Sequence, residues 1–325
     1  MKKFDIISIG DTTLDVFLEL EDAEVKCDKN NENCQLCVSY ADKVPVKKVT
    51  KVPAVGNAAN VAIGCARLGL KSALYTILGN DAIGKESFAV LKSEGVSTDY
   101  VEIDKTKDTN YSAVLNFKGE RTILVFHEPR DYKLPKLAKA DWMYLTAIGK
   151  GHEKLDAEII EYIEKTGAKL GFNPGDLQLR EGLEALRPII KKSEVVFFNK
   201  QEAERMVGKN QDVKELMRLL HQEGTKIVVI TDGSNGSYCF DGTGFYFQPV
   251  LKVPLIEMTG CGDAYSTGFI SALQLGYDIP TAMKWGTANA ASKLQKIGAR
   301  EGLLHRKDME GFIKGTVQLD FIKNN

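Results

Sequence analysis

Strand-like and helix-like segments alternate along most of this chain of 325 residues, and this order restricts the possible folds more than any other feature. The strand-like segments are short apolar runs, and between them apolar residues recur at helical spacing. We expect strands at 4–9, 72–78, 142–147, 168–173, 195–199 and 226–232. We expect helices at 58–68, 85–93, 154–166, 183–192, 201–207 and 213–223, many of them followed by a glycine. The order predicts an α/β protein with helices on both faces of a mainly parallel sheet.

Two strand-rich stretches interrupt this order, at about 12–52 and 98–130. Within the second, residues 111–117 and 121–126 flank a short turn and alternate as the two arms of a hairpin do. We expect the two stretches to form a small inserted sheet that acts as a lid over a cleft, as a dimer contact, or as both. Residues 1–325 are then a single domain with this insertion.

The charge balance argues against several classes of partner. Lysine and arginine total 43 against 44 aspartates and glutamates, so no net field favours nucleic acid or an anionic membrane. The first apolar run is bracketed by Asp5 and Asp11, which indicates a strand rather than a signal peptide. No run of about eighteen uncharged apolar residues could span a membrane. We therefore expect a cytoplasmic protein that binds neither nucleic acid nor a membrane.

Three of the six cysteines, Cys27, Cys34 and Cys37, lie close together in the sequence. A chain without a secretion signal is expected to keep its thiols reduced, so a disulfide is the least expected state. The spacing could provide three ligands of a Zn²⁺ ion, with a fourth ligand elsewhere. The alternative is a polar loop in which the cysteines are merely small residues.

The motif Thr259-Gly260-Cys261-Gly262-Asp263 follows the strand-like stretch 245–256 and opens the apolar segment 264–275. Small residues at a helix start let backbone N–H groups converge on one point, and the helix dipole adds positive potential there. A phosphate would fit this anion hole. Asp263, in the first helical turn, could accept the proton of an alcohol that attacks the terminal phosphate of a nucleotide. The alternative is an ordinary turn in which glycines relieve packing and Asp263 complements the dipole.

Polar residues after the first strand indicate a substrate site. Asp11 and Asp15 follow that strand at the carboxyl edge of the sheet, where open α/β sheets bind ligands. A carboxylate there could accept hydrogen bonds from two neighbouring sugar hydroxyls, or it could only cap the strand end. Further candidates at the same edge are Gly56, Asn57, Asn60 and Asn173. Of these, Asn57 could simply cap a helix.

Residues near two later strands indicate a nucleotide site. Asn199 and Glu202 begin a helix after a strand, where they could hold the water ligands of Mg²⁺ or form a capping box. The expected nucleotide-lining residues are Thr231, Gly233, Gly236, Thr259 and Asn289.

Taken together, these motifs resemble the ribokinase-type sugar and nucleoside kinases, also called the phosphofructokinase-B family, over essentially the whole chain. The resemblance implies a ribokinase-like three-layer sandwich with a β-sheet lid. It implies that Asp263 is the catalytic base and that Gly260, Cys261 and Gly262 form the anion hole. It also implies ATP and Mg²⁺, with K⁺ a further candidate, a sugar or nucleoside as acceptor, and a homodimer formed through the lid.

The chain departs from the family pattern at three places. Val55 stands where the family usually has glycine, and Cys261 replaces a common alanine. Glu257-Met258-Thr259 replaces the usual Asp-Thr-Thr, whose aspartate helps to bind a monovalent cation, so potassium activation is open. A helix N-terminus is expected to lower the pKa of the Cys261 thiol.

The sequence therefore predicts an ATP-dependent kinase of a sugar, a sugar derivative or a nucleoside. A nucleoside kinase is the first alternative, and a non-catalytic metal- or partner-binding protein on a kinase core is the second. A dinucleotide-dependent oxidoreductase needs G-x-G-x-x-G after the first strand, and Gly10-Asp11-Thr12-Thr13 lacks it.

Overall fold

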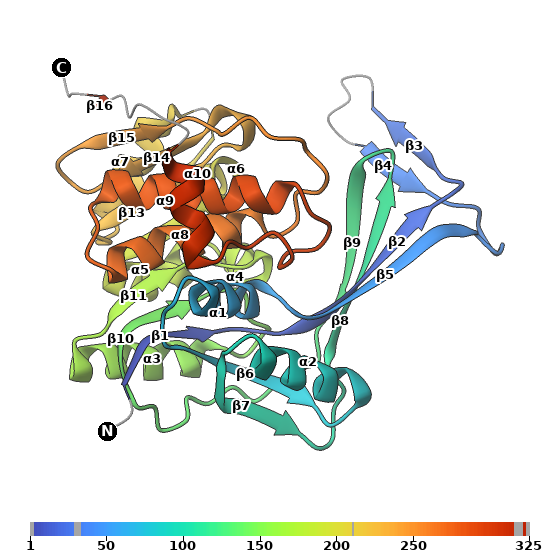
Figure 1. The fold of residues 1–325 in the computed structure, drawn as a ribbon, viewed down its shortest axis with the longest axis horizontal. Coiled ribbons are helices and arrows are strands. Elements are labelled where there is room, and N and C mark those ends of the chain that lie inside the picture. The colour runs from blue at the N-terminus through green and yellow to red at the C-terminus, as the bar shows by residue number, and fades with distance from the viewer. Residues whose placement is uncertain (1–2, 29–33, 210, 315–320, 323–325) are drawn as a thin grey trace.

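The structure is a computed structural model that describes residues 3–28, 34–209, 211–314 and 321–322. Its main sheet has ten strands in the order β16-β15-β14-β13-β12-β11-β10-β1-β6-β7 (Figure 1). Neighbours from β7 to β13 are parallel, and β14, β15 and β16 add antiparallel strands at one edge. The strands are β1 (Lys3–Ile9), β6 (Ser72–Gly79), β7 (Ser97–Asp104), β10 (Lys139–Leu145), β11 (Lys169–Phe172), β12 (Val195–Asn199), β13 (Ile227–Thr231), β14 (Ser237–Phe240), β15 (Phe245–Gln248) and β16 (Phe321–Ile322).

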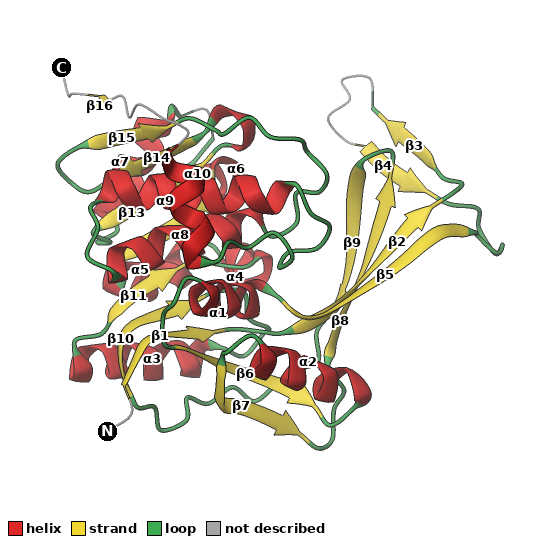
Figure 2. Cartoon of the chain, in the orientation of Figure 1, coloured by secondary structure: helices red, strands yellow, loops and turns green. Residues whose placement is uncertain are grey.

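Helices cover both faces of this sheet (Figure 2). One face packs against α3 (Glu153–Thr166), α4 (Asp176–Glu181), α5 (Leu183–Lys192), α6 (Lys200–Val207) and α7 (Val213–Gln222). The other packs against α1 (Asn57–Arg67), α8 (Cys261–Gln274), α9 (Ile279–Leu294) and α10 (Arg306–Lys314), while α2 (Ala82–Ser93) contacts β6 and β7. Along β10, Trp142 and Tyr144 join one core while Met143 and Leu145 join the other, as expected of a strand buried on both faces. The result is the expected three-layer sandwich.

A separate small sheet projects from this body at the right of Figure 1. Its strands are β5 (Val46–Val55), β2 (Thr13–Leu20), β8 (Asn110–Phe117) and β9 (Glu120–Phe126), in that order. A further hairpin, β3 (Glu24–Cys27) with β4 (Cys34–Cys37), extends from the same end. The inserted sheet and its hairpin of β8 and β9 are thus confirmed. None of the helices in the described ranges has the length and apolar character needed to cross a membrane.

The expected strands and helices of the main body are confirmed within a few residues, but two boundaries are wrong. The stretch 98–104 does not belong to the insertion, because β7 pairs in parallel with β6 in the main sheet. The stretch 245–256 is a strand only as far as Gln248. Pro249 and Pro254 lack the backbone N–H that a continuing strand would use, so the chain runs on as a loop to α8.

The expectation of reduced thiols is wrong for two of these cysteines, and the candidate zinc site loses two of its three ligands. Cys27 and Cys34 face each other across the β3–β4 hairpin, with 4.0 Å between their Cα atoms, and form a disulfide. Cys37 remains a free thiol. Within the described residues, no group of three or more His, Cys, Asp or Glu side chains is placed to hold a metal ion. The pairing of the two strands decides which sulfur atoms meet, and the spacing in the sequence does not show this.

Candidate active site

Two cavities adjoin at the carboxyl edge of the main sheet, beside the start of α8. The first, here called the polar cavity, has a volume of about 350 Å³, and the second, the apolar cavity, about 440 Å³. Side chains that line the polar cavity include Asn57, Arg121, Asn173, Asp176, Asn199, Glu202 and Asp263. The apolar cavity is lined by Val250, Leu251, Val253, Leu255, Ala290, Ala291 and Leu294, among others. Both are bordered by Thr231, Met258, Cys261, Gly262 and Tyr265, so the start of α8 lies between them.

The backbone at the start of α8 leaves N–H groups without intrahelical acceptors beside open space. Gly260 has a φ of 77°, and a Cβ atom there would lie 2.5 Å from the Cβ of Ala299, so glycine is required. The N–H of Cys261 bonds to the carbonyl of Met258. The N–H groups of Gly262 and Asp263 lie in the first turn, where a helix offers no acceptor. A Cβ at Gly262 would meet no atom within 4 Å, so this side of the turn is open.

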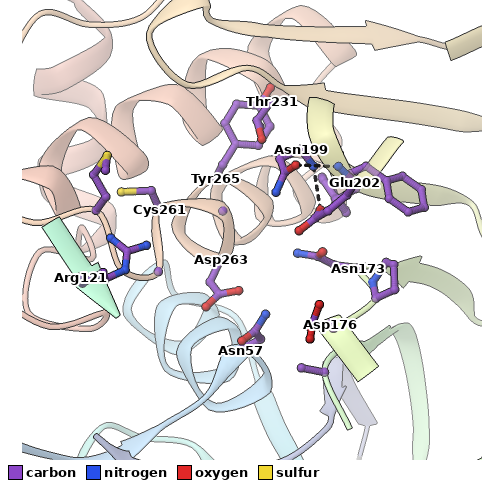
Figure 3. Close-up of a pocket in the computed structure, with 18 residues that line it drawn as sticks. Asn57, Arg121, Asn173, Asp176, Asn199, Glu202, Thr231, Cys261, Asp263 and Tyr265 are labelled. Carbon is purple, nitrogen blue, oxygen red and sulfur yellow. Dashed lines mark hydrogen bonds between the residues drawn. The ribbon is translucent and has the colours of Figure 1, made fainter. Parts of the chain in front are cut away.

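Asp263 directs its carboxylate into the polar cavity, on the side of Asn57 (Figure 3). The residue is only 5% exposed, and its Oδ2 accepts a hydrogen bond of 2.8 Å from the Nδ2 of Asn60. Burial raises the pKa of Asp263 to about 6, and the negative charges of Glu202 and Asp15 act in the same direction. The Asn60 hydrogen bond opposes this rise. A carboxyl group with this pKa is ionised at neutral pH and is still basic enough to accept a proton.

Two predicted substrate residues, Asp11 and Gly56, lie against each other where β1 ends. The carboxylate of Asp11 accepts hydrogen bonds of 2.9 and 3.0 Å from the Tyr132 hydroxyl and lies 3.1 Å from the Nδ1 of His127. Gly56 has a φ of 104°, and a Cβ there would lie 2.5 Å from the carbonyl oxygen of Asp11. Gly56 therefore allows the start of α1 to approach the end of β1. Neither residue is among those that line the cavity.

Asp15 and Asn60 lie beside Asp263 without lining the polar cavity. Burial raises the pKa of Asp15 to about 6, although the Ser112 hydroxyl on β8 donates a hydrogen bond to it. Asp15 belongs to β2, so the small sheet brings a second buried carboxyl group close to the candidate base.

Asn57, Asn173, Asn199 and Glu202 all line the polar cavity. Asn57 is the first residue of α1, whose N-cap is Gly56, so it does not have the capping role considered above. Asn199 and Glu202 do form the capping box: Asn199 Oδ1 accepts from Glu202 N at 2.9 Å, and Glu202 Oε2 accepts from Asn199 N at 2.8 Å (Figure 3). Burial raises the pKa of Glu202. The cap therefore orients both side chains at the cavity wall.

The predicted nucleotide residues divide into two groups. Thr231, Gly233 and Gly236 line the apolar cavity. Thr259 and Asn289 are not among the residues that line either cavity. The buried amide of Asn289 donates to the Ala264 carbonyl at 2.7 Å and accepts from Leu304 N at 2.8 Å, so it joins α8 to the segment after α9.

Arg121 is a cavity residue that the sequence reasoning missed. It lies at the start of β9 in the small sheet, and its guanidinium reaches the polar cavity opposite Asn173 (Figure 3). An Nη1 atom of Arg121 lies 3.5 Å from Oε1 of Glu257. A single arginine beside a hairpin turn is usually a solvated surface residue, so the sequence offers no signal for this position.

The residues around Glu257 do not fit a potassium ion. Both the backbone carbonyl and the carboxylate of Glu257 already accept hydrogen bonds from Lys293 Nζ, at 2.7 and 2.9 Å. A second cation at these oxygens would be repelled by the ammonium group.

The expected low pKa of the Cys261 thiol is also wrong. Burial raises the pKa to about 11, and the nearby positive charge of Lys293 opposes this only in part. Loss of hydration is the largest cause of this rise.

Comparison with known proteins identifies the family of the chain. The model of the pfkB family carbohydrate kinases matches residues 20–306. An uncharacterized sugar kinase of Archaeoglobus fulgidus is 28% identical over 74% of this chain and 98% of its own length. A 5-dehydro-2-deoxygluconokinase of Geobacillus kaustophilus is 26% identical over 80% of this chain and 84% of its own length.

The fold is ribokinase-like. The structure of Arabidopsis thaliana ribokinase complexed with ribose and ATP superimposes with a TM-score of 0.79, covering 97% of this chain and 100% of that one at 19% identity. A putative ribokinase II from E. coli, solved in complex with ATP and Mg²⁺, superimposes with a TM-score of 0.76, covering 96% of this chain and 99% of that one at 16% identity. The family match, which spans most of the chain, carries the assignment of activity: this chain belongs to the pfkB family of carbohydrate kinases and is a phosphotransferase.

Proposed function

We propose that this kinase binds a sugar or sugar derivative in the polar cavity and ATP in the apolar cavity, and that the small sheet is a lid inserted into one kinase domain. The observation that carries the proposal is the position of the α8 start, which borders both cavities and bears Asp263. The apolar cavity suits a flat purine base, because aliphatic side chains dominate its lining. The amides and carboxylates of the polar cavity suit hydroxyl groups.

In the proposed reaction, Asp263 accepts the proton of the acceptor hydroxyl as that oxygen attacks the terminal phosphorus of ATP. A new oxygen–phosphorus bond forms, the bond to the bridging oxygen breaks in line with it, and ADP leaves with the electron pair. The N–H groups of Gly262 and Asp263 stabilise the charge on the transferred group. Asn199 and Glu202 would hold Mg²⁺ through water, and that ion supplies charge neutralisation at the phosphates.

Three further residues have proposed binding roles. Asn57 and Asn173 line the polar cavity and would bind acceptor hydroxyls. Arg121 places a positive charge at the same cavity, where it would contact the transferred phosphoryl group or an acidic group of the acceptor. An acidic acceptor agrees with the name of the gluconokinase relative. We therefore propose that sugar acids are among the best acceptors.

An ADP-release assay with a panel of ketoses, aldoses, sugar acids and nucleosides tests this function. We expect ADP release above the acceptor-free rate with at least one sugar or sugar acid, and Asp263→Asn measures the background. A response to nucleosides alone would instead identify a nucleoside kinase. ADP release that no acceptor increases would count against the proposal and favour a non-catalytic role.

The activity is expected to fall on the acid side of pH 6. Asp263 acts as a base only when ionised, and its pKa is about 6, so kcat/KM should decrease as pH falls through that value. The pKa of Asp15 is also about 6, and its negative charge contributes to the raised pKa of Asp263. Removing this negative neighbour in Asp15→Asn should move the acid limb to lower pH. A wild-type limb near pH 4, the ordinary range of an aspartate, would contradict the assignment.

We also propose that two copies of the chain associate through the lid. Ile123, Leu124, Val125 and Phe126 follow one another on β9, and each is between 40% and 56% exposed. Within the described residues β9 is an edge strand of the small sheet, with β8 as its neighbour. An exposed apolar edge strand favours pairing with another chain, and a second copy presents the same surface.

Light scattering after size-exclusion chromatography measures this association. We expect a dimer for the wild type and a monomer for Leu124→Lys, because a charged side chain in the contact opposes pairing. Lys165→Glu on α3, far from the small sheet in Figure 1, is the control that should leave the mass unchanged. A monomeric wild type would refute this contact.

A further inference from the structure

Lys293 is a buried cation close to the anion hole. It lies in the last turn of α9, and its side chain is 0% exposed. Its ammonium group donates to the backbone carbonyl of Glu257 at 2.7 Å and to the Oε2 of that residue at 2.9 Å. A lysine is rarely buried to this degree unless a carboxylate compensates its charge. Apolar packing therefore does not explain why the charged pair of Lys293 and Glu257 is buried here.

Glu257 connects this cation to the anion hole. Its Oε1 accepts a hydrogen bond of 2.5 Å from Thr259 N, and its Oε2 accepts one of 3.3 Å from Gly298 N. Burial opposes ionisation of Glu257, but the Thr259 hydrogen bond and the charge of Lys293 outweigh it and lower the pKa. The residue after Gly298 is Ala299, which packs directly against Gly260. The pair thus joins the end of α9, the 257–262 loop and the 298–299 turn.

The ligands of the ammonium group are those that a monovalent metal ion would use. A carboxylate oxygen and a backbone carbonyl oxygen are hard oxygen donors, and an ammonium group resembles K⁺ in charge and size. Here the positive charge is covalently tethered to α9, so it needs no ion from solution.

We propose that the Lys293 ammonium is a built-in monovalent cation that, through Glu257, holds the 257–262 loop in its anion-binding conformation and makes the kinase independent of added potassium. Lys293 is a positioning residue, because it contacts the loop and does not line either cavity. The inference rests on the proposed function of the Gly262 and Asp263 amides.

The wild type provides the first test. Turnover and the thermal midpoint are measured at constant ionic strength in the chloride salts of potassium, ammonium, sodium and tetramethylammonium. We expect both quantities to be the same in all four salts, to within about twofold in kcat, because no free cation binds at the site. Activation by potassium of about tenfold or more, relative to tetramethylammonium, would overturn the proposal.

Two variants at the same position separate a cation role from an ordinary ion pair. Lys293→Ala leaves space for an ion, whereas Lys293→Met fills that space with a neutral chain. We expect kcat to fall about 10- to 100-fold in both, as is typical when an outer-shell partner is lost. Potassium or ammonium should restore kcat and raise the thermal midpoint of Lys293→Ala alone.

A Lys293→Ala protein whose kcat and thermal midpoint respond equally to all four salts would show an ordinary ion pair and overturn the inference. If the variant does not fold, the wild-type salt series decides alone. If no acceptor in the panel is phosphorylated, the proposed function fails separately, while the salt-specific thermal midpoint of Lys293→Ala still tests the cation site.

Discussion

Asp263→Asn should lower kcat by about 10²- to 10⁴-fold, the range associated with loss of a positioned general base. The amide is nearly isosteric and keeps a partner for Asn60, so the cavity should keep its shape. ATP affinity should change little, because the apolar cavity lies on the other side of the α8 start. Initial rates and calorimetric titration with ATP measure the two effects.

The same variant should be more stable than the wild type at pH 7. The folded-state pKa of Asp263 is about 6, above its ordinary value of 3.8, so ionisation opposes folding as pH rises through this interval. At pH 7 the amide removes this cost, and the gain should be about 1 to 2 kcal/mol in the free energy of unfolding. Glu161→Gln, at an exposed position on α3, is the control for loss of a carboxylate.

Wild-type turnover in Asp263→Asn would remove the base assignment.

Gly262→Val should reduce kcat/KM by about 10²- to 10³-fold, comparable with the loss of an oxyanion-hole donor. A Cβ at this position meets no protein atom within 4 Å, so the added side chain occupies the space over the α8 amides where the phosphoryl group would lie. The protein should still fold, because valine is tolerated in a helix at least as well as glycine.

Gly311→Val in α10 is a matched control, since a Cβ there also meets nothing within 4 Å and the helix lies outside both cavities. Both proteins should have thermal midpoints near that of the wild type, and only Gly262→Val should lose activity and ATP affinity. Unchanged kcat/KM in Gly262→Val would mean that the phosphoryl group does not approach these amides.

The main body was predictable from sequence because its signals are local. A short apolar run identifies the strand Val195–Asn199, and apolar residues at helical spacing identify the amphipathic helix Val213–Gln222. Each pattern lies within the segment itself. The error at 98–104 arose because pairing between β6 and β7 is a contact between distant segments. The end of the strand at Gln248 has a local signal, since Pro249 and Pro254 interrupt the apolar run and lack the backbone N–H that a strand needs.

The candidate site was predictable only where its residues belong to one motif. The glycines at 260 and 262 and the aspartate at 263 are adjacent, so one helix start places them together. Arg121 reaches the same cavity from the small sheet, and its position depends on how that sheet is held over the body. Asn289 was expected to line the nucleotide site, but its buried amide instead joins two backbone segments.

By itself, the amino-acid sequence determined the layered α/β architecture, the inserted sheet and the glycine-rich start of α8, because each follows from periodicity or from a short motif. The tertiary structure alone decided that Lys293 neutralises Glu257, that Cys27 meets Cys34, and that burial sets the pKa of Asp263. These depend on distances between segments far apart in the chain and on the exclusion of water. The spacing of residues within a single motif shows neither the distances between distant segments nor the loss of water around a side chain.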